Sequence, residues 1–159
     1  MTNFRNLASM TITWAMFLLC ALSPRATSAG ATAADSEALA QRWVQRLAAT
    51  MEEHATPADV DRLLDLYAND AVYEHPHAGA RVEGKALLRE GTLSHLGETR
   101  APKIVITQTI AGESFAIIEI TVKLELRRDA QWAPMERRQV VVLELKDSRI
   151  QRIIDHWGP

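Results

Sequence analysis

The sequence contains little that would mark a cofactor enzyme, a nucleic-acid binder or a disulfide-stapled domain. Its 159 residues include one cysteine, Cys20. They contain no phosphate-binding glycine loop, no dinucleotide fingerprint and no cysteine-based zinc pattern. The formal net charge is −2, so there is no basic excess to attract nucleic acid. We therefore expect neither an organic cofactor, a metal nor a nucleic-acid partner.

The apolar run near the N-terminus is shorter than a membrane-spanning helix. Arg5 precedes a run from Met10 to Leu22, and the small residues "ATSAGATA" follow. This is the pattern of a secretory signal peptide, whereas crossing a bilayer takes about 20 apolar residues. We expect residues 1–29 to be removed and the mature protein to be secreted or periplasmic, without a membrane anchor. An uncleaved N-terminal anchor is the alternative.

The chain that would remain after cleavage has an ordinary globular composition. Residues 1–29 carry two arginines and no acid, which leaves 16 basic and 20 acidic side chains. Cys20 would be lost with the signal peptide, so the mature protein would contain no disulfide. Its length suits one domain with a sizeable core.

Helical periodicity dominates the first part of this domain. From Asp35 to about His54, apolar residues recur every three or four positions, which predicts an amphipathic helix. Pro57 favours the first turn of a second helix, and Gly97 is a candidate C-terminal cap for a third helix over 85–96.

Alternating apolar and polar residues predict strands in the rest of the chain. A short strand is expected after the second helix, and four longer strands follow the third helix. The expected ranges are 71–75, 103–111, 113–127, 135–146 and 149–157. This order predicts an α+β domain in which helices cover one face of a curved antiparallel sheet.

The stretch "LLDLYANDAVYEHP" after the second helix carries a resemblance to a known family. With the order of elements, it resembles the nuclear transport factor 2-like superfamily, particularly its SnoaL-like and ketosteroid-isomerase-like members. The resemblance covers residues 36–158. It implies a cone-shaped fold in which a curved antiparallel sheet, with three helices on its concave side, encloses a pocket.

The resemblance also implies site residues. His75 stands where ketosteroid isomerases carry the aspartate that shuttles the proton. Trp43 stands at the position of their oxyanion-holding tyrosine, and Val141 near that of their protonated aspartate. Because tryptophan is a weaker donor and valine offers none, ordinary steroid isomerisation by that mechanism is not expected. Asp155 matches an acid that SnoaL-like cyclases carry on the final strand.

These positions suggest general acid–base chemistry. An imidazole both accepts and returns a proton near neutral pH, so we expect His75 to act as base and Asp155 to orient it or act as a second acid or base. Trp43, Tyr67 and Trp157 would hold an apolar or ring-shaped ligand, with Val141 beside them. In the alternative interpretation, His75 and Asp155 only satisfy nearby backbone groups.

Three functions remain open from the sequence. The first is an isomerase, cyclase or lyase that uses no cofactor. The second is a module that binds an apolar or ring-containing small molecule without changing it, and the third is an interaction domain. A homodimer through the outer face of the sheet is expected by resemblance. A metal site at His75, His77 and Asp155 is a weaker alternative.

Overall fold

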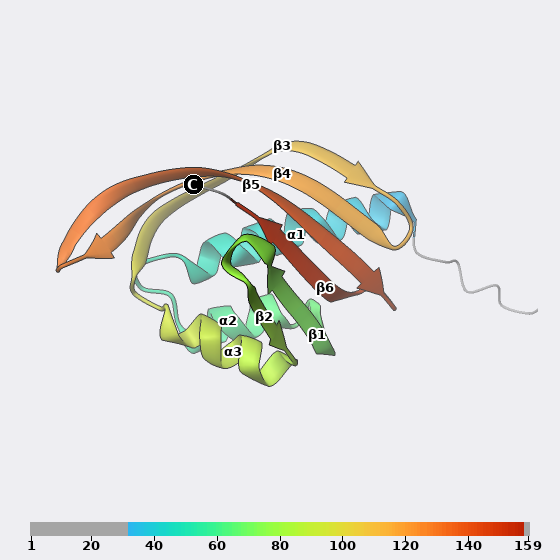
Figure 1. The fold of residues 1–159 in the computed structure, drawn as a ribbon, viewed down its shortest axis with the longest axis horizontal. Helices are drawn as coiled ribbons and strands as arrows, with labels where there is room; N and C mark the ends of the chain where they lie inside the picture. The colour runs from blue at the N-terminus through green and yellow to red at the C-terminus, as the bar shows by residue number, and fades with distance from the viewer. Residues whose placement is uncertain (1–31, 158–159) are drawn as a thin grey trace, which may run out of the picture.

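The computed structural model describes residues 32–157, so the predicted signal peptide lies outside the described residues. Three helices, one 3-10 turn and six strands follow one another in this part of the chain (Figure 1). In chain order they are α1 (Ala33–Thr50), α2 (Pro57–Leu64), β1 (Tyr67–His75), η1 (Pro76–Ala78), β2 (Ala80–Glu83), α3 (Lys85–Ser94), β3 (Thr99–Ala111), β4 (Phe115–Arg128), β5 (Gln131–Lys146) and β6 (Arg149–His156).

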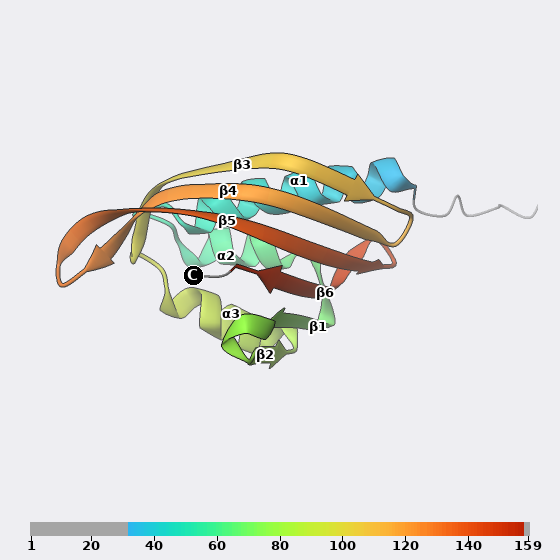
Figure 2. The ribbon, with the colours of Figure 1, turned by 45° about the horizontal axis from the view of Figure 1, so that its top comes forward.

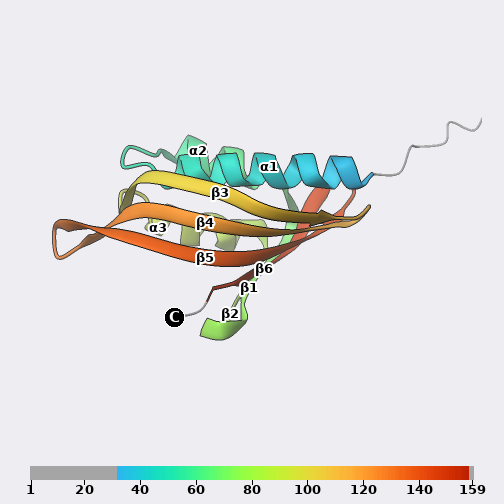
Figure 3. The same cartoon turned by 90° about the horizontal axis from the view of Figure 1, so that it is seen from above.

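The six strands form one open, curved sheet in the order β2-β1-β6-β5-β4-β3. The long strands β3, β4 and β5 arch over the helices, and α1 runs along β3 and β4 (Figures 1 and 3). Figure 2 shows α3 and β2 at the β1 end of the sheet. The expected α+β fold, with helices on the concave side of a curved sheet, is confirmed.

Two details of the sheet differ from the expectation. Residues Ala80–Glu83 pair with β1 as a short edge strand, where no strand was predicted. β1 also pairs with β6 in parallel, so the sheet is mixed. Both differences arise from pairing between segments, whereas alternation within a segment reports only its own conformation.

Local sequence explains why α1 and β4 form. Thr32 and Asp35 make a capping box at the start of α1, in which each residue's side chain bonds the other's backbone N–H. In β4, every second side chain is buried from Ala116 to Leu124. Its buried face meets the apolar stripe of α1, including Leu39 and Trp43, in one core.

None of the helices within residues 32–157 is long and apolar enough to cross a membrane.

Candidate active site

The inner, helix-facing side of the sheet brings together polar residues from three neighbouring strands. Tyr73 of β1 is in register with Ile153 of β6, and Asp155 of β6 is in register with Val141 of β5. Residues in register share a face, and residues two apart on a strand do so too. His75 and Asp155 therefore lie on the same side of the sheet.

His75 is held by the backbone of Asp155. The His75 Nδ1 atom lies 2.9 Å from the Asp155 carbonyl oxygen, and the side chain is only 5% exposed. A carbonyl oxygen can only accept, so Nδ1 must carry the hydrogen. In the neutral ring, Nε2 then keeps its lone pair. This arrangement leaves one nitrogen of His75 able to accept a proton.

The Asp155 carboxylate is held by two other side chains. The Gln139 Nε2 atom donates to both carboxylate oxygens at 3.1 and 3.2 Å, and the Tyr73 hydroxyl donates at 3.3 Å. Burial raises the pKa of Asp155 above its usual value, and the positive charge of Arg137 partly opposes that rise. A carboxylate with a raised pKa is a better proton acceptor than an exposed one.

Tyr73 belongs to the same electrostatic cluster. Burial raises the pKa of its hydroxyl, and the negative charge of Asp155 raises it further. Tyr73 is therefore a neutral donor to Asp155 under ordinary conditions.

Trp157 contacts both His75 and Arg137. Its ring stacks on the His75 imidazole with centroids 4.3 Å apart and planes inclined by 28°. The Arg137 guanidinium carbon lies 4.4 Å from the centroid of the same indole ring, which is cation–π geometry. Trp157 is partly exposed, so it presents an aromatic surface next to His75 and Arg137.

Trp43 and Tyr67 form a separate buried pair. The Trp43 indole N–H donates to the Tyr67 hydroxyl at 2.8 Å, and both side chains are buried. The pKa of Tyr67 is raised, mainly by burial. These two residues therefore have partners within the core, and Val141 is fully buried beside Asp155.

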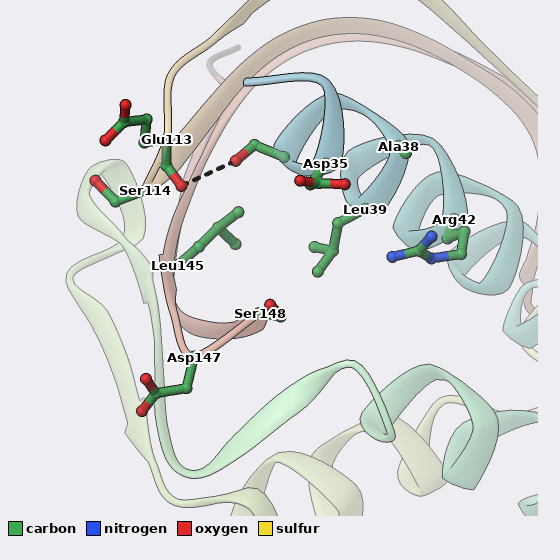
Figure 4. A pocket seen from close by; sticks show the side chains of 10 residues that line it. Asp35, Ala38, Leu39, Arg42, Glu113, Ser114, Leu145, Asp147 and Ser148 are labelled. Carbon is green, nitrogen blue, oxygen red and sulfur yellow. Dashed lines mark hydrogen bonds between the residues drawn. The ribbon is translucent and has the colours of Figure 1, made fainter. Parts of the chain in front are cut away.

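The two cavities described for this chain lie elsewhere. One, of about 270 Å³, lies at the start of α1 beside the β3–β4 and β5–β6 turns (Figure 4). In it the Ser36 hydroxyl, at 3.4 Å, donates to the carbonyl of Glu113. The other is an open groove of about 500 Å³ between β2 and α3. None of the six predicted site residues lines either cavity.

A metal site is not assembled by the described residues. Within residues 32–157, no three His, Cys, Asp or Glu side chains are grouped as a metal would require. His77 is exposed, with its ring centroid 6.4 Å from that of His75.

Sequence reasoning missed three members of the cluster: Tyr73, Arg137 and Gln139. The sequence does contain a signal for them, because Arg137 and Gln139 precede Val141 at intervals of two residues on one strand. Tyr73 likewise precedes His75 by two residues on β1. Once Val141 and His75 were placed in the site, strand alternation would have added all three.

Comparisons with known proteins agree with this architecture. The SnoaL-like domain family matches residues 40–153. No curated protein sequence matches the chain significantly.

Solved structures with the same fold share little sequence with this chain. A protein from Kribbella flavida, provisionally described as a ketosteroid isomerase, is 21% identical, with a TM-score of 0.60 and 80% of each chain covered. A Shewanella putrefaciens protein, provisionally described as a SnoaL-like polyketide cyclase, is 12% identical, with a TM-score of 0.65 over 77% of this chain and 88% of that one.

An epoxide hydrolase from M. tuberculosis is 19% identical, with a TM-score of 0.58 over 76% of this chain and 84% of that one. At these identities the likeness concerns the fold alone. The family match extends over most of the described residues. This chain belongs to the SnoaL-like domain family.

Proposed function

We propose that this protein is an enzyme that uses no cofactor and moves a proton next to a carbonyl group of a small ring-containing molecule. The isomerase- and cyclase-type fold of its family supports that reaction class. The observation that carries the proposal is the hydrogen bond between His75 Nδ1 and the Asp155 carbonyl oxygen. It leaves the lone pair on Nε2, as a general base requires.

The reaction would begin when His75 Nε2 takes a proton from the carbon beside the substrate carbonyl. The electron pair of the broken C–H bond moves into the carbonyl group, which becomes an enolate. Returning the proton to another carbon completes an isomerisation. In a cyclisation, the enolate carbon attacks a second carbonyl group, and the alkoxide that forms takes the proton back from His75. The negative charge of Asp155 would stabilise the imidazolium formed between the two steps.

The substrate class follows from the aromatic surface beside the base. Trp157 is partly exposed, although His75 and Arg137 both lie against its ring, so a flat ring could contact its exposed edge while its carbonyl group approaches the imidazole. Trp43, Tyr67 and Val141 would support this surface from the core.

Proton exchange provides a test that does not require the natural substrate. Ring ketones are incubated in heavy water with the protein, and loss of the proton signal next to the carbonyl is followed by NMR. We expect the parent protein to accelerate exchange for some members of the panel. His75→Gln should lose that acceleration, and His156→Gln, on the exposed end of β6, should keep it. Equal exchange by both variants would refute the role of His75.

A binding module without catalysis is the second candidate. It is favoured by the burial of His75, which is only 5% exposed and so gives a substrate little access to the imidazole. If ring compounds raise the melting temperature of the protein but no member of the panel exchanges faster, the binding module is the better description.

We also propose that two copies associate through the outer face of the sheet. Ile110, Ile117, Val142 and Ile154 stand in register across β3, β4, β5 and β6 and form an apolar row on that face. Ion pairs between Glu119 and Arg138 and between Glu144 and Arg152 flank the row. An apolar strip bordered by both signs of charge suits a self-complementary, two-fold interface.

Export of the protein to a secreted or periplasmic location is a further proposal, based on the N-terminal sequence. The mass of the protein recovered from its native compartment tests it, because cleavage near Ala29 would remove the first 29 residues. Recovery of the full-length chain would contradict cleavage.

A further inference from the structure

Arg137 is a half-buried cation at the edge of the site, and the negative charge nearest to it in effect is that of Asp155. Within residues 32–157 it forms no ion pair, and its Nε atom is buried without a hydrogen-bond partner. Burial lowers the pKa of its guanidinium, and the negative charge of Asp155 only partly opposes this effect. A half-buried guanidinium whose Nε has no protein partner and that makes no direct ion pair is an unfavourable arrangement for folding alone.

Other arginines of the sheet are paired in the usual way. Arg138, the next residue, points to the outer face and pairs with Glu119. Arg152 also has a buried Nε without a partner, but its terminal nitrogens pair with Glu74 at 2.6 Å and with Glu144 at 3.2 Å. Burial without any ion pair distinguishes Arg137 from these two arginines.

The surroundings of Arg137 restrict which ligand group could bind its guanidinium. Its guanidinium lies over the Trp157 ring, which also stacks on His75. Arg137 and the proposed base, His75, therefore contact the same aromatic side chain. A guanidinium N–H binds an oxygen that carries negative charge better than it binds a neutral one.

We propose that Arg137 binds an anionic oxygen of the ligand, and that the ligand is a flat ring compound bearing a carboxylate or enolate next to the ring. This assignment rests on the proposed function of the same site and specifies its substrate class. An enolate oxygen would gain its charge only as His75 removes the proton, so Arg137 would favour the transition state. A carboxylate would be bound in the ground state.

One probe with a carboxylate, one with an enolate oxygen and one neutral control distinguish the two kinds of anionic ligand. The probes are 2-naphthoate, its neutral isostere 2-naphthamide, and the ring enolate of 1,3-indandione under mildly alkaline conditions. Binding to the full chain is measured by calorimetry. The variants are Arg137→Met, Arg137→Lys and the matched outer-face control Arg138→Met.

We expect the parent protein to bind at least one of the two anions, and naphthamide much more weakly. Arg137→Met should weaken anion binding about 10- to 100-fold, the usual range for losing a hydrogen bond to a charged group. Arg137→Lys should restore part of the affinity, and Arg138→Met should leave it unchanged. Preference for naphthoate would indicate a substrate carboxylate, and preference for the indandione enolate would indicate the reacting oxygen.

The melting temperature of unliganded Arg137→Met is compared with that of Arg137→Lys, which keeps a positive charge near Asp155. This comparison separates lost binding from lost folding. Equal anion affinity of Arg137→Met and Arg138→Met, equal binding of naphthoate and naphthamide, or no binding of either anion by the parent would overturn the assignment. Exchange that depends on His75 could still be found in any of these cases, so the two proposals fail separately.

Discussion

At the scale of single residues, the site contains ionisable side chains whose burial is unfavourable for folding. Asp155 lies in a setting that disfavours its charge, and its carboxylate depends on Gln139 and Tyr73 for hydrogen bonds. The His75 imidazole is almost fully buried. Such unfavourable placements are common at functional sites, where stability is given up for reactivity.

The Asp155 carboxyl gives the stability of the protein a pH dependence with a known sign. Its folded-state pKa is raised, so its contribution is fully present below the unfolded value, about 3.9, and declines as pH rises through the folded value. Asp155→Asn removes the ionisation that causes this loss of stability. We expect it to melt a few degrees higher than the parent at neutral pH, with the difference shrinking toward pH 4.

Calorimetric melting across this range checks the expectation, with Asp129→Asn in the exposed β4–β5 turn as the matched control. A difference that grows on acidification would contradict the raised pKa of Asp155.

The buried pair of Trp43 and Tyr67 should be important for stability. Tyr67→Phe removes the acceptor of the Trp43 N–H, and an unsatisfied buried donor costs about 1–3 kcal/mol. Urea unfolding should show a loss of this size. If Tyr67→Phe unfolds at the same urea concentration as the parent, the indole N–H must have found another partner.

At the scale of elements, sequence periodicity predicted most helices and long strands but not how all the strands pair. The alternation in β4 and the stripe in α1 come from a single buried face, which a sequence pattern reports directly. The parallel pairing of β1 with β6 joins residues far apart in the chain, such as Tyr73 and Ile153. No local pattern encodes that contact.

The same pairing determines how much of the site could be predicted. Resemblance and alternation placed His75, Asp155 and Trp157 on one face. They could not indicate that His75 contacts the main-chain carbonyl of Asp155 rather than its carboxylate, because that depends on the β1–β6 register.

Two glycines near α3 should respond oppositely to alanine. Gly97 has φ +78° in the turn after the helix, where alanine is strained, so Gly97→Ala should lose about 1 kcal/mol. Gly91 lies within α3, and a methyl group there would meet open space. Gly91→Ala should gain about 0.5–1 kcal/mol from helix propensity. Chemical unfolding of both variants provides the comparison, and equal signs would show that backbone conformation is not the cause.

At the scale of the whole molecule, the two faces of the sheet carry different kinds of residues. The inner face holds the core and the acid–base cluster, and the outer face carries the apolar row of Ile110, Ile117, Val142 and Ile154. Catalysis is proposed on one face and association on the other, so the two can be tested independently.

A charge placed in the centre of the apolar row should separate the copies. Val142→Lys would desolvate an ammonium group in the proposed interface, so we expect light scattering to report a dimer for the parent and a monomer for the variant. Thr121→Lys, farther along the outer face, should remain dimeric. A monomeric parent protein at high concentration would contradict the proposed interface.

The most direct test of the proposed base is the protonation state of the His75 ring in the free protein. Nitrogen–proton NMR correlation spectra of the histidine rings, assigned with His75→Gln, distinguish the two neutral tautomers. We expect neutral His75 to carry its hydrogen on Nδ1 and none on Nε2, because the Asp155 carbonyl oxygen can only accept a hydrogen bond. A neutral ring with its hydrogen on Nε2 would contradict the proposed general base, since its lone pair would then face the backbone.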